Sequence, residues 1–377
     1  MSFKRADSGA ITVLSSAQGG RVTLADRQVI MLGSNNYLGL ANHPTVKAAV
    51  IDAVDRYGIG ACINPCFVQT PIHAQLAEEV AAHLGAEDVV LYASCSAANA
   101  GVLATLATTG DVILSDQMNH ASIIDGCRLS RARSVVYAYR DPQDLERGLA
   151  ANKGEAATLV ITDGVFSMEG HLAPLAALLG AAERVGAQLI VDDSHATGVV
   201  GRLGAGSASA AGLSGKRVIT TGTFSKALGG APGGFVAGSR AMTEILRSHS
   251  RSFIFTTGMS VADAAAALAA LCLLRQSPEH HERLWANTQL FRQLLRGRGF
   301  AIEDSPSPIT PLLVGDANRA KRIHARLLSL GVYVPVMAFP VVAHGDARLR
   351  AQPSAALTPE EVHHVADAID SAFQERA

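Results

Sequence analysis

A lysine lies between a run of small residues and a cluster of glycines. Lys226 follows TGTFS at 221–225 and precedes glycines at 229, 230, 233 and 234. A lysine sheltered from water loses its proton more readily and can then attack a carbonyl such as an aldehyde. The glycine cluster lacks a GK[ST] ending, which excludes a Walker A nucleotide loop. Loop lysines also have ordinary structural or solvated roles, so Lys226 needs partners before it predicts chemistry.

A carboxylate and a histidine follow another strand-like run. Asp192 and His195 come directly after QLIV at 188–191. A carboxylate at a strand end, shielded from water, pairs strongly with a cation such as a protonated pyridine nitrogen. The same spacing is also compatible with an aspartate that caps a turn. Asp192 is therefore a candidate partner for a heteroaromatic ring.

A serine-rich turn is the third candidate feature, after Lys226 and Asp192. Ser94, Cys95 and Ser96 precede a predicted helix, whose free N–H groups can bind a phosphate, although ordinary helix capping explains the serines equally well. An anion site, a carboxylate and a lysine at neighbouring strand ends are what one pyridoxal phosphate requires. That cofactor stabilises a carbanion on a bound amino acid. The conjunction predicts a pyridoxal phosphate site.

The elements that must position these residues form an α/β pattern. Short apolar runs rich in Val and Ile recur between residues 88 and 240: VVLYA, DVILSD, SVVYAY, TLVITDG, QLIVDD, RVITTGT and GFVAG. Helix-length stretches such as 96–108 and 175–185 separate most of them, which is typical of a largely parallel sheet covered by helices. A short glycine-rich loop joins the last two runs, so we expect that pair to be antiparallel. Ligands of such sheets bind beyond the carboxyl ends of the strands.

The flanking segments predict two further parts. Residues 1–40 form an expected arm with a hairpin at 19–32, and residues 41–260 form the cofactor-binding large domain. Residues 261–377 form an expected smaller α+β domain. It contains helical stretches at 262–298, 317–330 and 359–375, and strands at TPLLVG, VYVPVM and ARLRAQ.

Composition limits the function classes. With 32 Lys and Arg against 33 Asp and Glu, the chain has almost no net charge and therefore no electrostatic field that would attract it to nucleic acid or an anionic membrane. Its 17% of charged residues beside 48% of hydrophobic ones predicts a homo-oligomer whose second copy covers part of the surface. The start of the chain lacks a secretory pattern, so a cytoplasmic location is expected. Five cysteines without a CxxC pair predict neither a disulfide frame nor a metal site.

The chain resembles the α-oxoamine synthases, pyridoxal phosphate enzymes of the aspartate aminotransferase fold (fold type I). They join an amino acid to an acyl thioester such as acyl-CoA, usually with decarboxylation, to give an α-amino ketone. The resemblance runs from SNNYLGLANHP at 34–44 to ARLRAQPSAALTPEE at 347–361, and TDGVFSMEG, VDDSHATGVVG and TGTFSKALGG are its most specific motifs. It implies a mostly parallel seven-stranded large domain, a smaller C-terminal domain and a homodimer with shared active sites.

The resemblance also implies a role for each site residue. Lys226 would form the Schiff base with the cofactor and, once freed, remove the Cα proton of the amino acid. Asp192 would bind the pyridine nitrogen, His195 the phenolic oxygen, and His120 would stack on the ring. The remaining residues would hold the phosphate (Ser94, Cys95, Ser96, Thr223 and, from the other subunit, Thr256) and the substrates (Asn35 and Arg350 at the carboxylate, Ser167 on the acyl side).

One segment departs from the family pattern. Anchored on His73, GACINPCFVQTPIHAQLA has Asn64 where the family has an arginine and Val68 where it has a glycine. In the 5-aminolevulinate synthase branch that arginine meets the carboxylate of succinyl-CoA, so an uncharged acyl group is expected here. The short N-terminal segment leaves a carrier-protein thioester open as the donor. The same fold also hosts aminotransferases and, in this family, a non-catalytic scaffold subunit, although such a subunit would lack the lysine.

Overall fold

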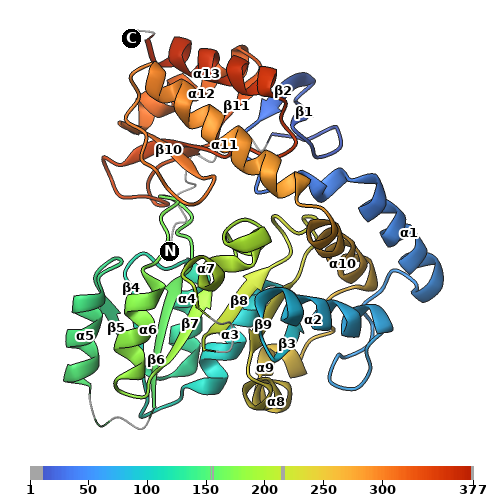
Figure 1. Cartoon of the computed structure of the whole chain (residues 1–377), viewed down its shortest axis with the longest axis vertical. Helices are drawn as coiled ribbons and strands as arrows, with labels where there is room; N and C mark the ends of the chain where they lie inside the picture. Colours follow the sequence, from blue (N-terminus) through green and yellow to red (C-terminus); the bar gives the residue numbers. More distant parts are fainter. Residues whose placement is uncertain (1–11, 153, 155–156, 214–216, 375–377) are drawn as a thin grey trace, which may run out of the picture.

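A seven-stranded sheet forms the centre of the larger lobe in Figure 1. In this computed structural model, which describes residues 12–152, 154, 157–213 and 217–374, the sheet has the order β3-β9-β8-β7-β6-β4-β5. Strands β4 to β8 run parallel, whereas β9 is antiparallel to both β3 and β8. The seven predicted runs and the antiparallel last pair are confirmed. The strands are β3 (Asp88–Tyr92), β4 (Val112–Asp116), β5 (Arg133–Tyr137), β6 (Thr158–Asp163), β7 (Gln188–Asp192), β8 (Ile219–Thr223) and β9 (Gly234–Gly238).

Helices cover both faces of this sheet, because alternate side chains of each strand point to opposite faces. Val160 of β6 packs with the face that carries α5 and α6, whereas its neighbour Ile161 packs with the face that carries α3 and α4. Side chains of β3 and β9 also pack against α2 and α10 in a separate hydrophobic cluster. The helices of this lobe are α2 (Pro71–Leu84), α3 (Cys95–Leu106), α4 (Ala121–Ser130), α5 (Pro142–Ala151), α6 (Leu175–Glu183), α7 (Gly206–Ala210), α8 (Arg240–His249) and α9 (Arg251–Ile254), with the 3₁₀ turn η2 (Arg202–Gly204).

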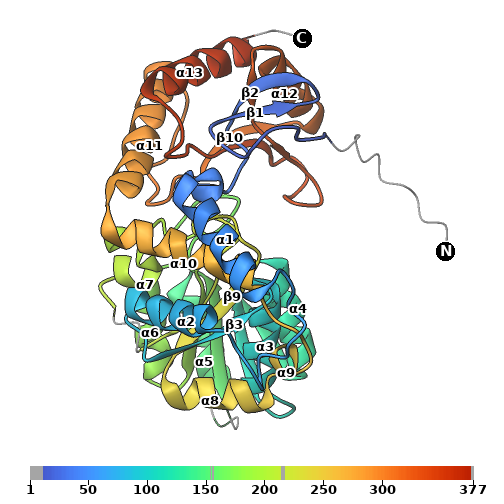
Figure 2. The ribbon, with the colours of Figure 1, turned by 90° about the vertical axis from the view of Figure 1, so that its right-hand side faces the viewer.

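A second lobe lies above the first in Figures 1 and 2. It holds two three-stranded sheets, β10-β13-β12 and β1-β2-β11. The hairpin predicted at 19–32 is present, with Ala25 and Asp26 at positive φ in its two-residue turn. The elements are β1 (Arg21–Leu24), β2 (Arg27–Met31), β10 (Thr310–Gly315), β11 (Val332–Tyr333), β12 (Val336–Met337), β13 (Ala347–Ala351), α11 (Glu279–Gly297), α12 (Ala317–Ser329) and α13 (Pro359–Gln374).

Prolines divide two elements that the sequence pattern predicts as continuous. The strand expected at VYVPVM splits into β11 and β12, which join different sheets on either side of Pro335. The helical stretch at 262–298 splits into α10 (Val261–Gln276) and α11 around Pro278. A proline lacks the N–H that a continuing ladder or helix needs.

Long segments connect the two lobes. The alanine-rich helix α10 packs on α1 (Pro44–Tyr57) and α2, as Figure 2 shows, while α11 continues from it to α13 in the upper lobe. The 3₁₀ turn η1 (Leu40–Asn42) precedes α1. The predicted limits of arm, large domain and small domain stay predictions.

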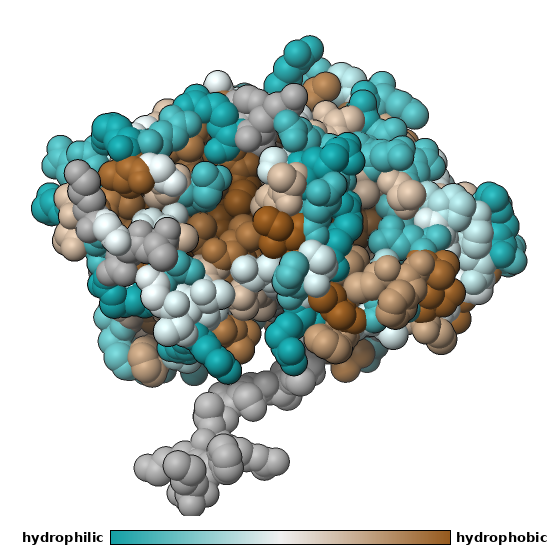
Figure 3. All heavy atoms as spheres, turned by 90° about the horizontal axis from the view of Figure 1, so that it is seen from below, coloured by the Kyte–Doolittle hydropathy of each residue, from teal (hydrophilic) through white to brown (hydrophobic). Residues whose placement is uncertain are grey.

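Apolar surface is not evenly spread. Seen from below, brown apolar side chains gather in a hollow within a largely teal polar surface in Figure 3. Within the described ranges, no helix has the length and apolar character that crossing a membrane requires.

Candidate active site

A cavity of about 260 Å³ opens where the carboxyl ends of β6, β7 and β8 meet the first turns of α3 and α4. This is where an open α/β sheet binds ligands. Nine of the twelve predicted site residues line it: Ser94, Cys95, Ser96, His120, Ser167, Asp192, His195, Thr223 and Lys226. Residues from distant parts of the sequence therefore share one small space.

Asp192 ends β7 and is only 3% exposed. Its Oδ1 accepts a hydrogen bond from the backbone N–H of Ser194 (2.9 Å), and its Oδ2 accepts one from the side-chain amide of Asn99 (2.7 Å). Donors on both oxygens stabilise the negative charge of a buried carboxylate. The arrangement suits a carboxylate that pairs with a cationic ring nitrogen.

Asn99 is a functional residue that the sequence reasoning missed. This fully buried side chain on α3 accepts a hydrogen bond from the Thr221 hydroxyl (2.7 Å) and donates to Asp192 and to Ser122 Oγ (2.9 Å). Ser122 Oγ in turn lies 2.8 Å from Nδ1 of His120. Asn99 thus connects two predicted cofactor contacts. The available signal was an amide in an otherwise small and apolar helix, CSAANAGVLATL.

Lys226 lies in the loop that joins β8 to β9. Because β9 turns back along β8, this loop stays at the carboxyl edge of the sheet, and Gly233 in it adopts φ 146° with Met259 too close for any side chain. Burial lowers the pKa of the Lys226 amine, while the negative charge of Asp192 opposes that shift. A larger fraction of neutral amine is available to react with a carbonyl.

A further residue that the sequence reasoning missed is Asp163, whose carboxyl group lies at the end of β6. Its Oδ2 accepts a hydrogen bond from the backbone N–H of His120 (2.9 Å), which fixes the start of α4. Burial and the nearby charge of Asp192 raise the pKa of Asp163 well above its usual range. Its position at the end of TLVITD, a predicted strand, was the signal in the sequence.

The start of α3 forms an anion cradle. Ser94 caps the helix by accepting a hydrogen bond from Ala97 N–H (3.1 Å), and the first residues of the helix line the cavity together with Thr223. The free N–H groups at a helix start are suited to bind an anion. Strand β9 passes so close that a Cβ on Gly234 would lie 2.4 Å from the nitrogen of Cys95. Together with Asp192 and Lys226, this donor set fits the phosphate, ring nitrogen and aldehyde of pyridoxal phosphate.

His195 lies beside the cavity in contact with a residue that the prediction did not include. Its Nδ1 is 2.8 Å from the hydroxyl of Tyr37, which belongs to the SNNYLGL motif. Burial lowers the pKa of His195 well below its usual range, and the charges of Lys226 and Arg350 act in the same direction. The imidazole is therefore neutral.

Arg350 and Asn35 lie at the side of the cavity. Arg350 is 4% exposed, donates from Nε to the carbonyl of Ser167 (2.5 Å) and has Nη1 3.5 Å from Oδ1 of Asn35. Among the described residues, its buried Nη2 makes no hydrogen bond. An unpaired guanidinium nitrogen beside the site suits a carboxylate ligand.

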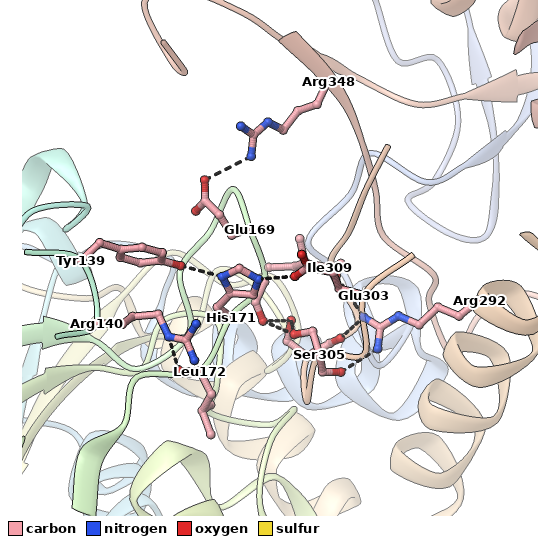
Figure 4. Close-up of polar contacts among 12 residues, drawn as sticks. Tyr139, Arg140, Glu169, His171, Leu172, Arg292, Glu303, Ser305, Ile309 and Arg348 are labelled. Carbon is pink, nitrogen blue, oxygen red and sulfur yellow. Dashed lines mark hydrogen bonds and ion pairs between the residues drawn. The ribbon is translucent and has the colours of Figure 1, made fainter. Parts of the chain in front are cut away.

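The loop that carries Ser167 is held by the other lobe, as Figure 4 shows. Glu169 forms an ion pair with Arg348 (3.1 Å), and His171 lies between the Tyr139 hydroxyl (2.9 Å) and Glu303 (2.8 Å). The carbonyl of Gly170 accepts hydrogen bonds from serine hydroxyls of the segment before β10. The position of Arg350 is thus tied to contacts between the lobes.

Thr256 lies outside the cavity of its own chain. It follows α9, where its hydroxyl accepts a hydrogen bond from Gly258 N–H (3.3 Å). Its predicted place is the active site of a second subunit, and that stays a prediction.

Comparisons with known proteins show the family to which the chain belongs. A profile of the class I and II aminotransferase family matches residues 27–369. The chain is 43% identical to 8-amino-7-oxononanoate synthase of Symbiobacterium thermophilum (93% of this chain, 89% of that protein) and 41% identical to 2-amino-3-ketobutyrate coenzyme A ligase of Escherichia coli (94% and 90%). A serine palmitoyltransferase from S. paucimobilis, solved with pyridoxal phosphate and myriocin, superposes with a TM-score of 0.92 at 29% identity, covering 97% of this chain and 92% of that one. The chain belongs to the α-oxoamine synthases, pyridoxal phosphate-dependent enzymes with the class I and II aminotransferase fold.

Proposed function

We propose that this protein condenses an amino acid with an uncharged acyl thioester and releases an α-amino ketone, carbon dioxide and the free thiol. The observation that carries the proposal is the meeting of Lys226, Asp192 and the α3 N-terminus in one cavity, with the unpaired Nη2 of Arg350 beside it. Bound pyridoxal phosphate supplies an electron sink for the carbanion at Cα of the amino acid.

Each side chain has a task in this scheme. Lys226 would hold the cofactor through its amine and, when free, would remove the proton from Cα of the amino acid. Its lowered pKa favours the neutral amine that this step needs. Asp192 would pair with the ring nitrogen, His120 would stack on the ring, and the cradle with Thr223 would hold the phosphate.

The amino acid is oriented by its carboxylate. Arg350 and Asn35 bind that group, and the carbonyl of Ser167 fixes the guanidinium through Nε. A planar guanidinium that is already held loses little freedom on binding a carboxylate.

An uncharged acyl group is supported by the segment around Asn64. Where the family has an arginine, the Asn64 amide donates to the carbonyl of Ile254 (2.5 Å) and its oxygen accepts from Cys66 N–H (2.9 Å), so its polar atoms are engaged. Ile63 and Val68 line a separate cavity of about 100 Å³ beside it, and none of the described residues around that cavity is a lysine or an arginine. An acyl carboxylate would therefore lack a cationic partner there. Coenzyme A is the proposed carrier.

A homodimer with shared active sites forms part of the proposal. Ile59, Phe67 and Phe255 are 75%, 84% and 72% exposed, which is unusual for large apolar side chains on a free surface. They flank Asn64 and Thr256, the two residues that the family resemblance places at or near the acyl and phosphate sites. A second copy that covers them would bring Thr256 to its partner's cofactor. The cytoplasmic location stays a prediction from the sequence.

The proposal is tested by thiol release. The holoenzyme is incubated with glycine, alanine or serine and with acetyl-CoA or longer acyl-CoAs, while a thiol reagent reports free coenzyme A and mass spectrometry identifies the ketone. We expect release that requires both substrates and that Lys226→Ala abolishes. Release only from a carrier-protein thioester would replace coenzyme A as the donor. Amino transfer to a 2-oxo acid without thiol release would overturn the condensation in favour of an aminotransferase.

A further inference from the structure

We propose that Tyr37 is a positioning residue that decides which ring nitrogen of His195 carries the proton. Its hydroxyl donates to Nδ1, so that Nε2 carries the hydrogen and is a donor toward the cofactor. The inference rests on the proposed function, because that function assigns His195 to the phenolic oxygen of pyridoxal phosphate.

The contact is short and has little freedom to adjust. The Tyr37 hydroxyl lies 2.8 Å from Nδ1 of His195, and the tyrosine is 1% exposed. The backbone around it is pinned to the other lobe: Ala355 N–H donates to the carbonyl of Tyr37 (2.8 Å), and the Ser354 hydroxyl donates to that of Asn36 (2.8 Å). The phenol is therefore presented at a fixed place.

The direction of this hydrogen bond follows from the partners of the hydroxyl. Among the described residues, Nδ1 of His195 is the hydrogen-bond partner of the buried Tyr37 hydroxyl. If Nδ1 carried the hydrogen, the phenolic hydrogen would be buried without an acceptor, so the phenol donates and Nδ1 accepts. A neutral imidazole that accepts at Nδ1 must carry its hydrogen on Nε2.

The protonation states of Tyr37 and His195 agree with this direction. Burial raises the pKa of Tyr37 to about 12 despite the opposing charge of Arg350, so the phenol keeps its proton at neutral pH. Burial together with Lys226, Arg350 and His120 lowers the pKa of His195, so the ring stays neutral. A protonated phenol that donates to the unprotonated Nδ1 of a neutral imidazole satisfies the hydrogen-bonding needs of both groups.

Tyr37 thus lies near both ends of the site. The positive charge of Arg350, at the proposed carboxylate subsite, acts on the Tyr37 phenol, and the phenol contacts His195, which lines the cofactor cavity. Nothing in the motif SNNYLGL by itself indicates this role, since a tyrosine followed by Leu-Gly-Leu equally suits a packing residue.

The test is a pH titration of the visible absorption band of the bound cofactor in the wild type and in Tyr37→Phe. Loss of the hydroxyl lets the imidazole adopt the other tautomer, which weakens its hydrogen bond to the ionised phenolic oxygen. We expect the midpoint of the titration to rise by about one to two pH units, the shift that corresponds to one hydrogen bond to a charged group. The dissociation constant for pyridoxal phosphate should rise in parallel.

The control variant is Tyr92→Phe. Tyr92 is fully buried, and its hydroxyl donates to Ser250 Oγ (3.0 Å), away from the cavity. The two substitutions remove the same atom from a buried hydrogen bond. Tyr92→Phe should lower thermal stability about as much as Tyr37→Phe and leave the band titration at the wild-type midpoint.

A double-mutant cycle with His195→Asn tests whether Tyr37 affects the cofactor through His195 or by another route. In the His195→Asn background, Tyr37→Phe should add no further shift. An unchanged midpoint in Tyr37→Phe, or an equal shift in the His195→Asn background, overturns the role of Tyr37 while leaving the proposed function intact. Failure of the wild type to bind pyridoxal phosphate overturns the proposed function itself and the inference with it.

Discussion

Replacing Asn99 by leucine tests whether the α3 amide holds Asp192 for the cofactor. The substitution keeps the approximate volume and removes three hydrogen bonds, one of them to the Asp192 carboxylate. A hydrogen bond to a charged group contributes about 1.5–3 kcal/mol and a neutral one about 0.5–1.5 kcal/mol, so the free energy of unfolding should fall by about 2.5–6 kcal/mol.

The second consequence concerns the cofactor. Without Asn99, Oδ2 of Asp192 keeps only the weak thiol donor of Cys95 (3.7 Å), and the carboxylate loses its orientation toward the ring nitrogen. We expect the dissociation constant for pyridoxal phosphate to rise about tenfold, equivalent to about 1.4 kcal/mol. Urea unfolding of the apoprotein and fluorescence titration with the cofactor measure the two effects separately.

Asn287→Leu is the matched control. Asn287 is equally buried but donates to two neutral carbonyls, those of Ser354 and Leu357, both at 2.9 Å. It should cost about 1–3 kcal/mol of stability and leave cofactor affinity unchanged. If both variants weaken cofactor binding equally, or neither does, the reasoning about Asn99 is wrong.

An isosteric variant adds a pH signature. Asn99→Asp sets two carboxyl groups against each other, and a proton shared between them replaces the amide hydrogen only at low pH. Cofactor affinity of this variant should therefore approach that of the wild type at low pH and fall as the pH rises. A pH-independent affinity would contradict the assigned direction of the Asn99–Asp192 hydrogen bond.

Two further predictions concern contacts that hold the site and the sheet. Glu169→Gln removes the ion pair with Arg348, which contributes about 0.5–1 kcal/mol as a partly buried pair. The apparent KM for the amino acid should therefore rise about threefold while kcat changes little, as steady-state kinetics can measure. A loss of kcat at constant KM would contradict this prediction. For Asp88, burial raises the pKa, but hydrogen bonds from Arg247 and Thr243 outweigh it and lower the pKa to about 2. The stabilisation is complete above about pH 4 and is lost as the pH falls toward 2, so Arg247→Leu should unfold at a higher pH than the wild type in an acid titration followed by circular dichroism.

Much of the architecture followed from local patterns. Alternating blocks of Val- and Ile-rich runs and helix-length stretches predicted the seven strands, and the short glycine-rich connection between β8 and β9 predicted their antiparallel pairing. The division of the strand at Pro335 was not predicted because the apolar periodicity continues through VYVPVM, although a proline cannot continue the hydrogen-bond ladder.

The candidate site was predicted in a similar way. Residues that follow strands, such as Asp192 and the loop of Lys226, are marked by their position in the chain because strand ends gather at one edge of the sheet. Asn99 lies within a helix and Tyr37 within an N-terminal segment, so neither is adjacent in sequence to the groups it contacts.

The sequence by itself determined the identity of the reactive groups and the order of the elements that carry them, because strand and helix periodicity and strand-end position are local properties. Only the tertiary structure decided how those groups are oriented and charged. Burial lowers the pKa values of Lys226 and His195, and the partners Asn99 and Tyr37 arrive from other elements. Desolvation and hydrogen-bond direction depend on what surrounds a side chain in space, and no spacing along the chain encodes them.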